Sequence, residues 1–189
     1  MPGCAIWFVG LPGSGKSSVA RCAFEYCQAA GYDVLCHEMD KRRRKYFPNP
    51  QYTAEERAKA YSMFIDEAVE LVARGKVVLM DASAHKAAMR NAARKRIERF
   101  AEIMIKCELL EAMRREKARP AGLVMADMYE KALKRRETGE QFAGLGEVIG
   151  VDVPFEEANA ELTVDNTGLS LDETCRIVIA FLDTWLDNA

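Results

Sequence analysis

The stretch Gly10-Leu-Pro-Gly-Ser-Gly-Lys-Ser17 decides the fold of this chain. It matches the pattern G-x-x-x-x-G-K-[S/T], and it lies between an apolar run and a helical pattern that contains alanine. Its glycines let backbone N–H groups turn inward around an anion, and the N-terminus of the following helix adds partial positive charge. The stretch therefore predicts a phosphate cradle between a strand and a helix.

The cradle indicates a nucleotide, and the residues expected to bind its phosphates follow the strand directly. They are Gly10, Gly13, Ser14, Gly15, Lys16, Ser17 and Ser18. We expect Lys16 to place a point charge at the β- and γ-phosphates and Ser17 to offer its hydroxyl to Mg²⁺. A glycine-rich turn that binds no ligand is the alternative. The cradle does not indicate what is done with the nucleotide.

A parallel sheet is expected around the cradle, because short apolar runs alternate with longer helical patterns. The expected strands span residues 5–9, 33–39, 76–80, 102–107 and 161–164. The expected helices span residues 16–30, 53–74, 86–100, 109–119, 125–137 and 170–187. We predict one α/β domain over residues 1–189, with a five-stranded parallel sheet and helices on both faces. Residues 120–154 fit no strand and are charged, which predicts a helical lid.

Composition describes an ordinary globular chain of one domain. The 189 residues include 27 Lys and Arg and 29 Asp and Glu, for a formal net charge of −2. This balance argues against a protein that coats nucleic acid or an anionic membrane. No apolar run approaches the ~18 residues of a membrane span, and no basic segment typical of a secretory signal precedes the first strand. The six cysteines form no Cys-x-x-Cys pair, so we expect them to be reduced, in a cytoplasmic protein.

Carboxylates follow two of the predicted strands, at the edge of an open α/β sheet where ligands gather. Glu38 and Asp40 end the second strand, and Asp81 ends the third. We expect Asp40 to accept the proton of an attacking hydroxyl, Glu38 to contact the substrate, and Asp81 to hold Mg²⁺ or contact the substrate. Helix N-caps and turns are the alternative roles. We expect His37 to be a satisfied strand-end residue and His85 to lie on a surface loop.

A cationic run over residues 41–45 follows the second strand directly. It would attract an anionic second substrate, whereas a solvated helix face is the alternative. Within and beyond this run, Arg43, Arg57 and Arg90 are candidates for binding an anionic group of the substrate. Arg119 lies at the start of the expected lid and is a candidate for neutralising phosphoryl charge in the transition state.

Five segments of the chain resemble motifs of one known family. They are Gly10 to Ser17, which resembles G-L-S-G-[SA]-G-K-[ST]; Tyr52 to Arg57, which resembles F-S-x-x-x-R; residues 119–132, which resemble R-D-P-K-G-L-Y-K-K-A with five extra residues; residues 150–156, which resemble G-I-D-D-P-Y-E; and residues 161–170, which resemble E-L-x-L-D-T-D-G-L-S. On these motifs the chain is similar to the adenylyl-sulfate kinases. These P-loop enzymes phosphorylate the 3′-hydroxyl of adenosine 5′-phosphosulfate (APS).

The resemblance implies a P-loop NTPase fold, which is a three-layer sandwich with a helical lid. It also implies that ATP and Mg²⁺ bind at the cradle, that Arg57 and Lys131 bind the acceptor, and that Arg119 reaches ATP from the lid base. The chain departs from the family on the acceptor side. Residues 38–41 stand where the family has D-G-D-N, and residues 81–87 stand where it has S-[FA]-I-S-P-[YF]-R. The resemblance therefore supports a kinase of this family more firmly than APS as its acceptor.

We predict that the chain transfers phosphate from ATP to APS, giving ADP and 3′-phospho-APS. Asp40 is the expected base, and Asp81 is the second choice. A kinase of another anionic small molecule, a sugar or a polynucleotide hydroxyl is the first alternative. An NTPase or switch module without an acceptor is the second. The expected partners are ATP, Mg²⁺ and an anionic acceptor, without membrane or nucleic acid, and a homodimer is left open.

Overall fold

Five parallel strands form one sheet in the order β2-β3-β1-β4-β5. Their bounds are β1 Cys4–Val9, β2 Val34–Glu38, β3 Val77–Asp81, β4 Phe100–Lys106 and β5 Leu162–Asp165. The structure is a computed structural model that describes residues 2–118 and 127–187. It confirms the predicted five-stranded parallel sheet, and every strand begins and ends within two residues of its expected bounds.

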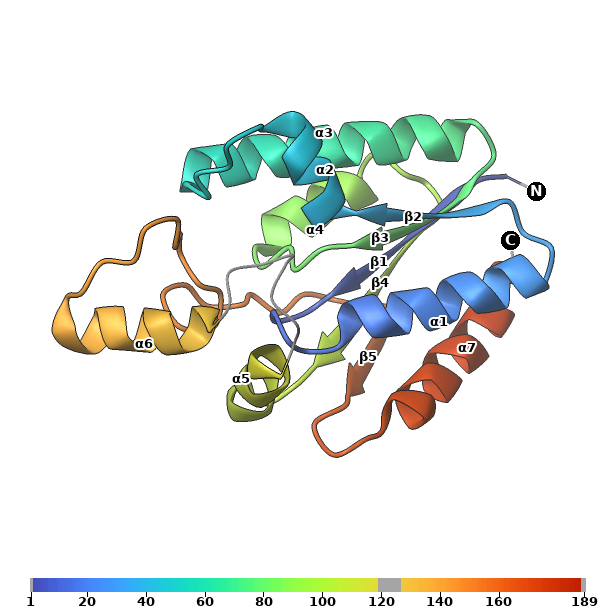
Figure 1. The fold of residues 1–189 in the computed structure, drawn as a ribbon. Helices are drawn as coiled ribbons and strands as arrows, with labels where there is room; N and C mark the ends of the chain where they lie inside the picture. Colours follow the sequence, from blue (N-terminus) through green and yellow to red (C-terminus); the bar gives the residue numbers. More distant parts are fainter. Residues whose placement is uncertain (1, 119–126, 188–189) are drawn as a thin grey trace.

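Helices cover both faces of this sheet. Their bounds are α1 Lys16–Ala29, α2 Met39–Tyr46, α3 Ala54–Ala73, α4 Ala87–Arg94, α5 Leu109–Lys117, α6 Met128–Thr138 and α7 Leu171–Asp187. Figure 1 shows α1 and α7 on one face and α3 and α4 on the other. The three layers confirm the predicted class of fold. Among the described helices, none is long and apolar enough to cross a bilayer.

The central strand β1 shows how the sequence produces these layers. All six of its residues are completely buried. Ile6 and Phe8 pack into the cluster under α1 and α7, whereas Trp7 and Val9 pack into the cluster under α3. The Trp7 ring lies 5.9 Å from the ring of Phe64. Because both faces are covered, the strand is a continuous apolar run rather than an alternating one.

Helix α2 was not expected as a separate element. The cationic run of residues 41–45 lies inside it, because Lys and Arg are good helix formers and no glycine or proline interrupts them. Glu38 is its N-cap residue and has an extended backbone. Asp40 lies in its first turn, where the helix dipole favours a negative charge. The alternative role of Asp40 as an N-cap is therefore wrong.

The helix expected over residues 86–100 is shorter than predicted. It ends at Arg94, and β4 already begins at Phe100. Ile97 and Phe100 are both buried in the cluster under α3. The chain turns between the helix and the strand so that both apolar side chains reach this core, and the pattern of apolar residues alone did not reveal the turn.

Cys22 of α1 and Cys175 of α7 are joined by a disulfide. The expectation that all six cysteines are reduced is therefore wrong for this pair. Its Cα atoms lie 6.1 Å apart, a usual distance for a disulfide, but the two residues are 153 positions apart in the sequence. Cys4 and Cys27 are free and buried, as expected. Burial raises the pKa of Cys4 to about 11 and that of Cys27 to about 12, so both stay thiols.

The expected lid begins outside the described residues, which do not include 119–126. Its described helix is α6, which projects from the edge of the sheet in Figure 1. Tyr129 and Ala132 of α6 form a small cluster with Val148, against which Leu109 and Met113 of α5 pack. Residues 139–161 contain turns and extended backbone but no further helix. The helix and the extended segment together occupy the position predicted for a lid.

Candidate active site

The phosphate cradle joins β1 to α1. Gly13 and Gly15 have positive φ angles of 84° and 91°, and Gly15 is the N-cap of α1. A Cβ atom on Gly13 would lie 2.2 Å from the backbone oxygen of Ala112. The first N–H groups of a helix have no partner within the helix, so those at the start of α1 are available to a phosphate. Lys16 opens this helix and is 8% exposed.

Side chains from later elements support the cradle. Asn166 donates from Nδ2 to the backbone oxygen of Ser14 at 2.8 Å. Arg115 donates to Oδ1 of Asn166 at 3.1 Å and to its backbone oxygen at 2.9 Å. The Tyr129 hydroxyl of α6 donates to the backbone oxygen of Pro12 at 2.8 Å. Neither Asn166 nor Tyr129 was a candidate from the sequence, because each lies more than 100 residues from the cradle.

Three carboxylates lie at the carboxyl ends of β2 and β3. Glu38 and Asp81 are register partners in the sheet, and Asp40 follows in the first turn of α2. Burial raises the pKa of the Asp81 carboxyl, and the charges of Asp40 and Glu38 act in the same direction. The charge of Lys16 and a hydrogen bond with Ser17 oppose this shift. The structure thus brings these carboxylates next to the cradle.

Asp81 and Ser17 fit a magnesium ion. Oδ1 of Asp81 is buried and has no hydrogen-bond partner among the described residues, while the side chain of Ser17 hydrogen-bonds to Asp81. Mg²⁺ prefers such oxygen ligands and usually keeps water and phosphate oxygens as its others. In the described part of the chain, no group of three His, Cys, Asp or Glu side chains could hold a metal ion.

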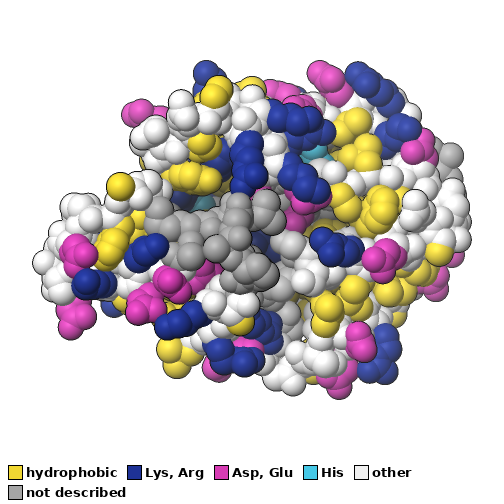
Figure 2. All heavy atoms as spheres, in the orientation of Figure 1, with side chains coloured by type: hydrophobic (Ala, Val, Ile, Leu, Met, Phe, Trp, Pro, Cys, Tyr) yellow, Lys and Arg dark blue, Asp and Glu magenta, His cyan; other side chains and the backbone are white. Residues whose placement is uncertain are grey.

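The cationic run of α2 divides into inward and outward side chains. Arg43 is buried: it contacts the Glu56 carboxylate at 3.2 Å, and its guanidinium lies 5.0 Å from the ring centre of Tyr52. The exposed members of the run are Lys41, Arg44 and Lys45. Figure 2 shows Lys and Arg side chains gathered on this face near α2 and α3. The exposed side chains of the run therefore form a solvated helix face. Arg43, the buried member, stays a candidate for binding the substrate.

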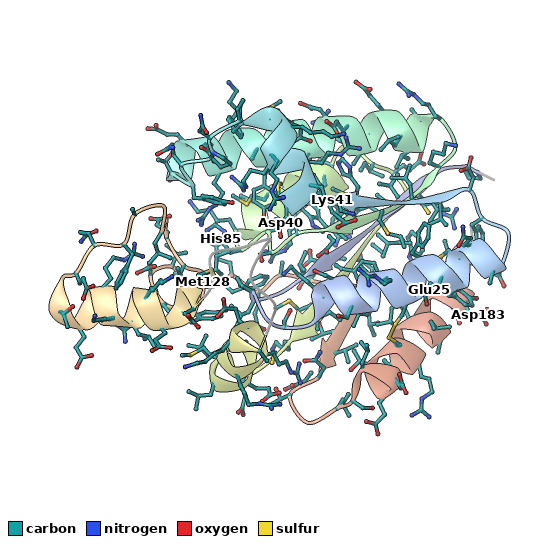
Figure 3. All side chains as sticks on the ribbon, viewed as in Figure 1. Glu25, Asp40, Lys41, His85, Met128 and Asp183 are labelled. Atoms are coloured by element: carbon teal, nitrogen blue, oxygen red, sulfur yellow. A yellow bond between two sulfur atoms is a disulfide. The ribbon has the colours of Figure 1, made fainter. Side chains whose placement is uncertain are left out.

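A pocket of about 330 Å³ lies between α3 and α4. Arg57 and Tyr61 of α3 line it, together with His85 after β3 and Glu147 after α6. Burial raises the pKa of Tyr61, and the nearby charges that act on it include Arg57 and Asp40. The pocket therefore adjoins the carboxylates. Figure 3 shows Asp40 and His85 on the side of the sheet from which α6 projects.

Arg57 lines this pocket, and the backbone of Glu147 binds one of its two Nη atoms. It is 7% exposed, and its Nη2 donates to the backbone oxygen of Glu147 at 2.9 Å. Its Nη1 lies 3.9 Å from the Glu147 carboxylate and is buried without a hydrogen-bond partner in the described part of the chain. Arg57 thus keeps one donor for a ligand, in keeping with its predicted role.

Arg90 is occupied by protein groups. It is completely buried, and its Nε lies 2.9 Å from Oε1 of Glu102. Its two Nη atoms donate to the backbone oxygens of Ala84 and Glu156, each at 2.5 Å. We therefore treat Arg90 as a residue that positions the segment before His85 rather than as a substrate ligand.

Both histidines are buried. Nε2 of His37 lies 2.9 Å from the backbone oxygen of Phe64, and its ring stacks on the Phe64 ring at 4.0 Å. Nδ1 of His37 is buried without a hydrogen-bond partner among the described residues, so the expectation of a satisfied strand-end residue holds for one ring nitrogen only. His85, expected on the surface, is only 2% exposed, because residues of α3 and the segment after α6 cover it. Burial lowers the pKa of His85 to about 4, and the charges of Arg57 and Lys86 act in the same direction. His85 is therefore neutral at pH 7.

Two of the residues predicted to bind a substrate belong to the expected lid. Arg119 lies outside the described residues, so its contact with ATP stays a prediction. Lys131 is a partly buried residue of α6, two positions after the tyrosine that contacts the cradle. Helix α6 is therefore the element that would carry Lys131 toward a bound ligand.

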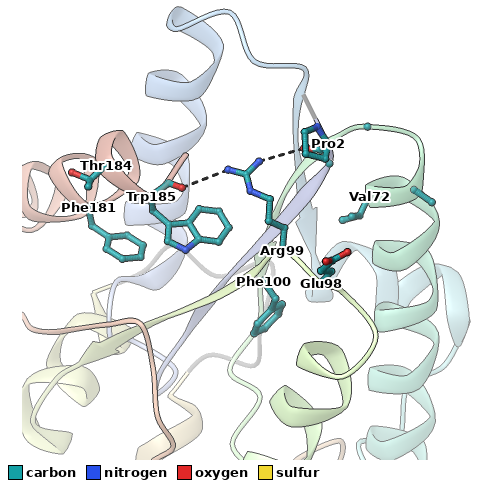
Figure 4. Close-up of a pocket in the computed structure, with 11 residues that line it drawn as sticks. Pro2, Val72, Glu98, Arg99, Phe100, Phe181, Thr184 and Trp185 are labelled. Carbon is teal, nitrogen blue, oxygen red and sulfur yellow. Dashed lines mark hydrogen bonds between the residues drawn. The ribbon is translucent and has the colours of Figure 1, made fainter. Parts of the chain in front are cut away.

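A larger depression of about 1090 Å³ lies at the opposite end of the sheet, where β1 and β4 begin. Figure 4 shows Arg99 and Trp185 in it. Nη2 of Arg99 donates to the backbone oxygen of Leu186 at 2.9 Å, and the guanidinium lies 5.2 Å from the Trp185 ring centre. Arg99 thus caps the end of α7. The depression contains none of the predicted site residues, so the smaller pocket is the candidate for the acceptor.

The fold and its cradle define the class of this molecule, which is a nucleotide-binding protein of the P-loop NTPase type. Within this class, the chain belongs to the adenylylsulphate kinase family, whose sequence profile matches residues 2–165. This confirms the resemblance seen in the motifs. A probable adenylyl-sulfate kinase of Archaeoglobus fulgidus is 32% identical over 161 residues, which cover 85% of this chain and 94% of the relative.

Further relatives support the same family. A probable adenylyl-sulfate kinase of Pyrococcus abyssi is 28% identical over 180 residues, which cover 95% of this chain and 94% of the relative. The solved APS kinase CysC of Mycobacterium tuberculosis, in complex with AMPPNP and APS, has a TM-score of 0.77 at 28% identity. That match covers 96% of this chain and 98% of the solved chain. The likeness therefore extends over the whole domain.

Proposed function

We propose that the protein transfers the γ-phosphate of ATP to the 3′-hydroxyl of APS, giving ADP and 3′-phospho-APS. The observation that carries the proposal is the position of the cradle, the carboxylates and the Arg57 pocket at one edge of the sheet. The named relatives are adenylyl-sulfate kinases, and the Mycobacterium tuberculosis enzyme was solved with both AMPPNP and APS. A phosphate donor and an anionic acceptor each have a fitting site here.

The cradle is the proposed site for the triphosphate of ATP. The N–H groups at the start of α1 would donate to phosphate oxygens, and Lys16 would neutralise charge on the β- and γ-phosphates. Ser17 and Asp81 would hold Mg²⁺, which supplies charge neutralisation on the phosphates when bound. Asn166 and Arg115 hold the loop from behind, so its geometry exists before the nucleotide binds.

Asp40 is the proposed base for the acceptor hydroxyl. It is exposed at the start of α2 and therefore accessible to a bound acceptor. Asp81 is the second candidate, but its hydrogen bond with Ser17 and its proximity to Lys16 favour the metal role. A carboxylate that removes the proton as the hydroxyl attacks makes the acceptor oxygen a better nucleophile.

The pocket beside α3 is the proposed site for the acceptor. Arg57 would bind its anionic group, and the exposed cations of α2 would attract it from solution. Helix α6 and the segment that follows would close over both substrates, and Arg119 would reach ATP from there. Exclusion of water by this closure would prevent hydrolysis of ATP.

The test is a coupled ADP-release assay with APS and a panel of other acceptors, with the product identified by mass spectrometry. We expect ADP release that depends on APS. Lys16→Ala should remove most of this activity, whereas the exposed control Lys95→Ala should retain it. Release that responds to another acceptor, or to none, would favour the two alternatives stated above and would reject APS as the substrate.

A cytoplasmic location stays a prediction, and a homodimer stays the alternative that the sequence left open. The Cys22–Cys175 disulfide counts against a cytoplasmic location, because disulfides persist mainly in oxidising compartments. Light scattering coupled to size-exclusion chromatography tests the homodimer, with a single peak at twice the chain mass of 21.2 kDa expected for the dimer. A peak at the mass of one chain would reject it.

A further inference from the structure

Two polar atoms in the pocket beside α3 lack partners. Nη1 of Arg57 and Nδ1 of His85 are both buried, and neither has a hydrogen bond within the described residues. The two side chains line the same pocket and are 7% and 2% exposed. Buried polar groups are nearly always paired, because an unpaired one costs free energy. Two unpaired groups in one pocket therefore point to a ligand that pairs with both.

The position of Glu147 indicates the charge of that ligand. Its carboxylate lies 3.9 Å from Nη1 of Arg57, which is too far for a hydrogen bond, and its side chain is 49% exposed. Its backbone oxygen, by contrast, accepts from Nη2 of Arg57 at 2.9 Å. The carboxylate can therefore turn into solvent while the backbone continues to hold the guanidinium. An anionic group of the acceptor would take its place.

The backbone before His85 fixes the direction of the imidazole. Ala84 has a φ of +46°, a conformation that alanine rarely adopts, and it is completely buried. Its N–H donates to the Tyr61 hydroxyl at 2.7 Å, and its carbonyl oxygen accepts from Arg90 at 2.5 Å. Strained backbone of this kind persists only where the surroundings hold it, often at ligand sites. Arg90 and Tyr61 thus hold His85 in the wall of the pocket.

His85 adds a hydrogen bond without adding a charge. Burial lowers the pKa of His85, and the charges of three cations, Arg57, Lys86 and Arg90, act in the same direction, while the Glu156 carboxylate opposes them. The resulting neutral ring has one nitrogen that donates and one that accepts. Among the described residues that line the pocket, the buried positive charge is that of Arg57, while Lys86 and Arg96 are exposed. This environment suits an oxyanion such as a sulfate, phosphate or carboxylate group.

We propose that His85 is a specificity-determining residue of the acceptor pocket: through Nδ1 it binds the same anionic group as Arg57, after that group has displaced the carboxylate of Glu147. The inference rests on the proposed function, because it takes the acceptor to be the anionic substrate of the kinase. It assigns to His85 the recognition of the anion and to Glu147 the role of a competing internal anion.

The test measures initial rates of the full chain with Mg·ATP and APS, for the wild type and four variants. We expect His85→Ala to raise the KM for APS about tenfold, the effect of losing one hydrogen bond to an anionic group, with kcat changed by less than about twofold. His85→Asn keeps a donor and should restore most of the affinity. Glu147→Gln removes the competing charge and should lower the KM. The surface control Lys59→Ala should leave both constants unchanged.

A second measurement separates this inference from the proposed function. Inorganic sulfate is titrated by calorimetry in the presence of Mg·AMPPNP. If APS is turned over and its KM is the same in the wild type and in His85→Asn, His85→Ala and Glu147→Gln, the inference is overturned and the proposed function stands. Absence of APS turnover, with sulfate binding weakened by His85→Ala and strengthened by Glu147→Gln, rejects APS and supports the inference. Neither turnover nor sulfate binding in the wild type overturns both. Should His85→Ala fail to fold, Glu147→Gln decides alone, through a lowered KM for APS or an unchanged one.

Discussion

Arg90 and Glu102 form an ion pair with almost no access to solvent, their side chains being 0% and 2% exposed. Replacement of Arg90 by Met would leave the buried carboxylate of Glu102 with only the more distant Arg94, at 3.9 Å, and breaking such a buried pair costs about 3–5 kcal/mol of unfolding free energy. Urea unfolding measures this cost. Arg96→Met is the matched control, because the pair of Arg96 with Asp66 is exposed and such pairs contribute about 0–1 kcal/mol. Equal losses in the two variants would contradict the structural role of Arg90.

The buried His85 predicts a loss of stability in acid. Its pKa is about 4 in the folded chain, against 6.5 for a free imidazole, so the unfolded chain binds more protons between these values. The contribution of the neutral ring is fully present above pH 6.5 and is lost as the pH falls toward 4. We expect His85 to account for a loss of about 2 kcal/mol between pH 7 and pH 5.

Urea unfolding at the two pH values tests this loss. His85→Asn should show a smaller decrease than the wild type, while it retains the decrease due to His37, whose pKa burial also lowers. An identical pH dependence in the two proteins would show that His85 does not titrate as the structure implies.

Gly13 in the cradle and Gly31 after the end of α1 provide a matched pair of glycines. Both have positive φ, 84° and 85°, but a Cβ atom would collide with Ala112 only at Gly13 and would have nothing within 4 Å at Gly31. We expect Gly13→Ala to abolish AMPPNP binding, because α5 and the loop cannot both keep their positions. Gly31→Ala should cost about 1–2 kcal/mol of stability and leave binding intact.

Calorimetric titration with Mg·AMPPNP measures the binding of both glycine variants. If Gly13→Ala binds AMPPNP with the same affinity as Gly31→Ala, the contact with α5 does not shape the cradle.

The disulfide between α1 and α7 predicts a redox-dependent stability. Its cysteines are far apart in the sequence, and cross-links that close long loops restrict the unfolded chain strongly. We expect Cys175→Ser to lower the free energy of unfolding by about 2–4 kcal/mol under oxidising conditions, with little change once the wild type is also reduced. Cys36→Ser, at an exposed free cysteine, is the control. Equal stability of wild type and Cys175→Ser without reductant would exclude a contribution from the bond.

Across the whole molecule, local patterns predicted what depends on local chemistry. The cradle and five strands follow from glycine spacing and apolar runs. The strand ends placed Glu38 and Asp81 correctly, because parallel strands bring their carboxyl ends to one edge. Helix α2 was predicted only as an alternative, the solvated helix face of residues 41–45, because a run of charged residues shows no apolar periodicity.

Contacts between distant segments could not be predicted from one sequence. The hydrogen bond between Asn166 and Ser14 joins residues 152 positions apart. The burial of His85 depends on α3 and on the segment after α6, and neither leaves a mark on the residues around His85. Arg90 shows the same limit. From the sequence, an arginine near a strand end is a candidate for binding an anion, and only the structure reveals that its partner is the buried Glu102.

The Tyr129–Pro12 hydrogen bond and the Arg57–Glu147 contact anchor one stretch of chain at both of its ends. One anchor is on the loop that would hold the donor, and the other is in the pocket that would hold the acceptor. We expect the ligand that binds first to restrict this stretch further, so that the second ligand loses less conformational entropy on binding. The two affinities are thereby linked, and by thermodynamic reciprocity each ligand strengthens the other by the same factor.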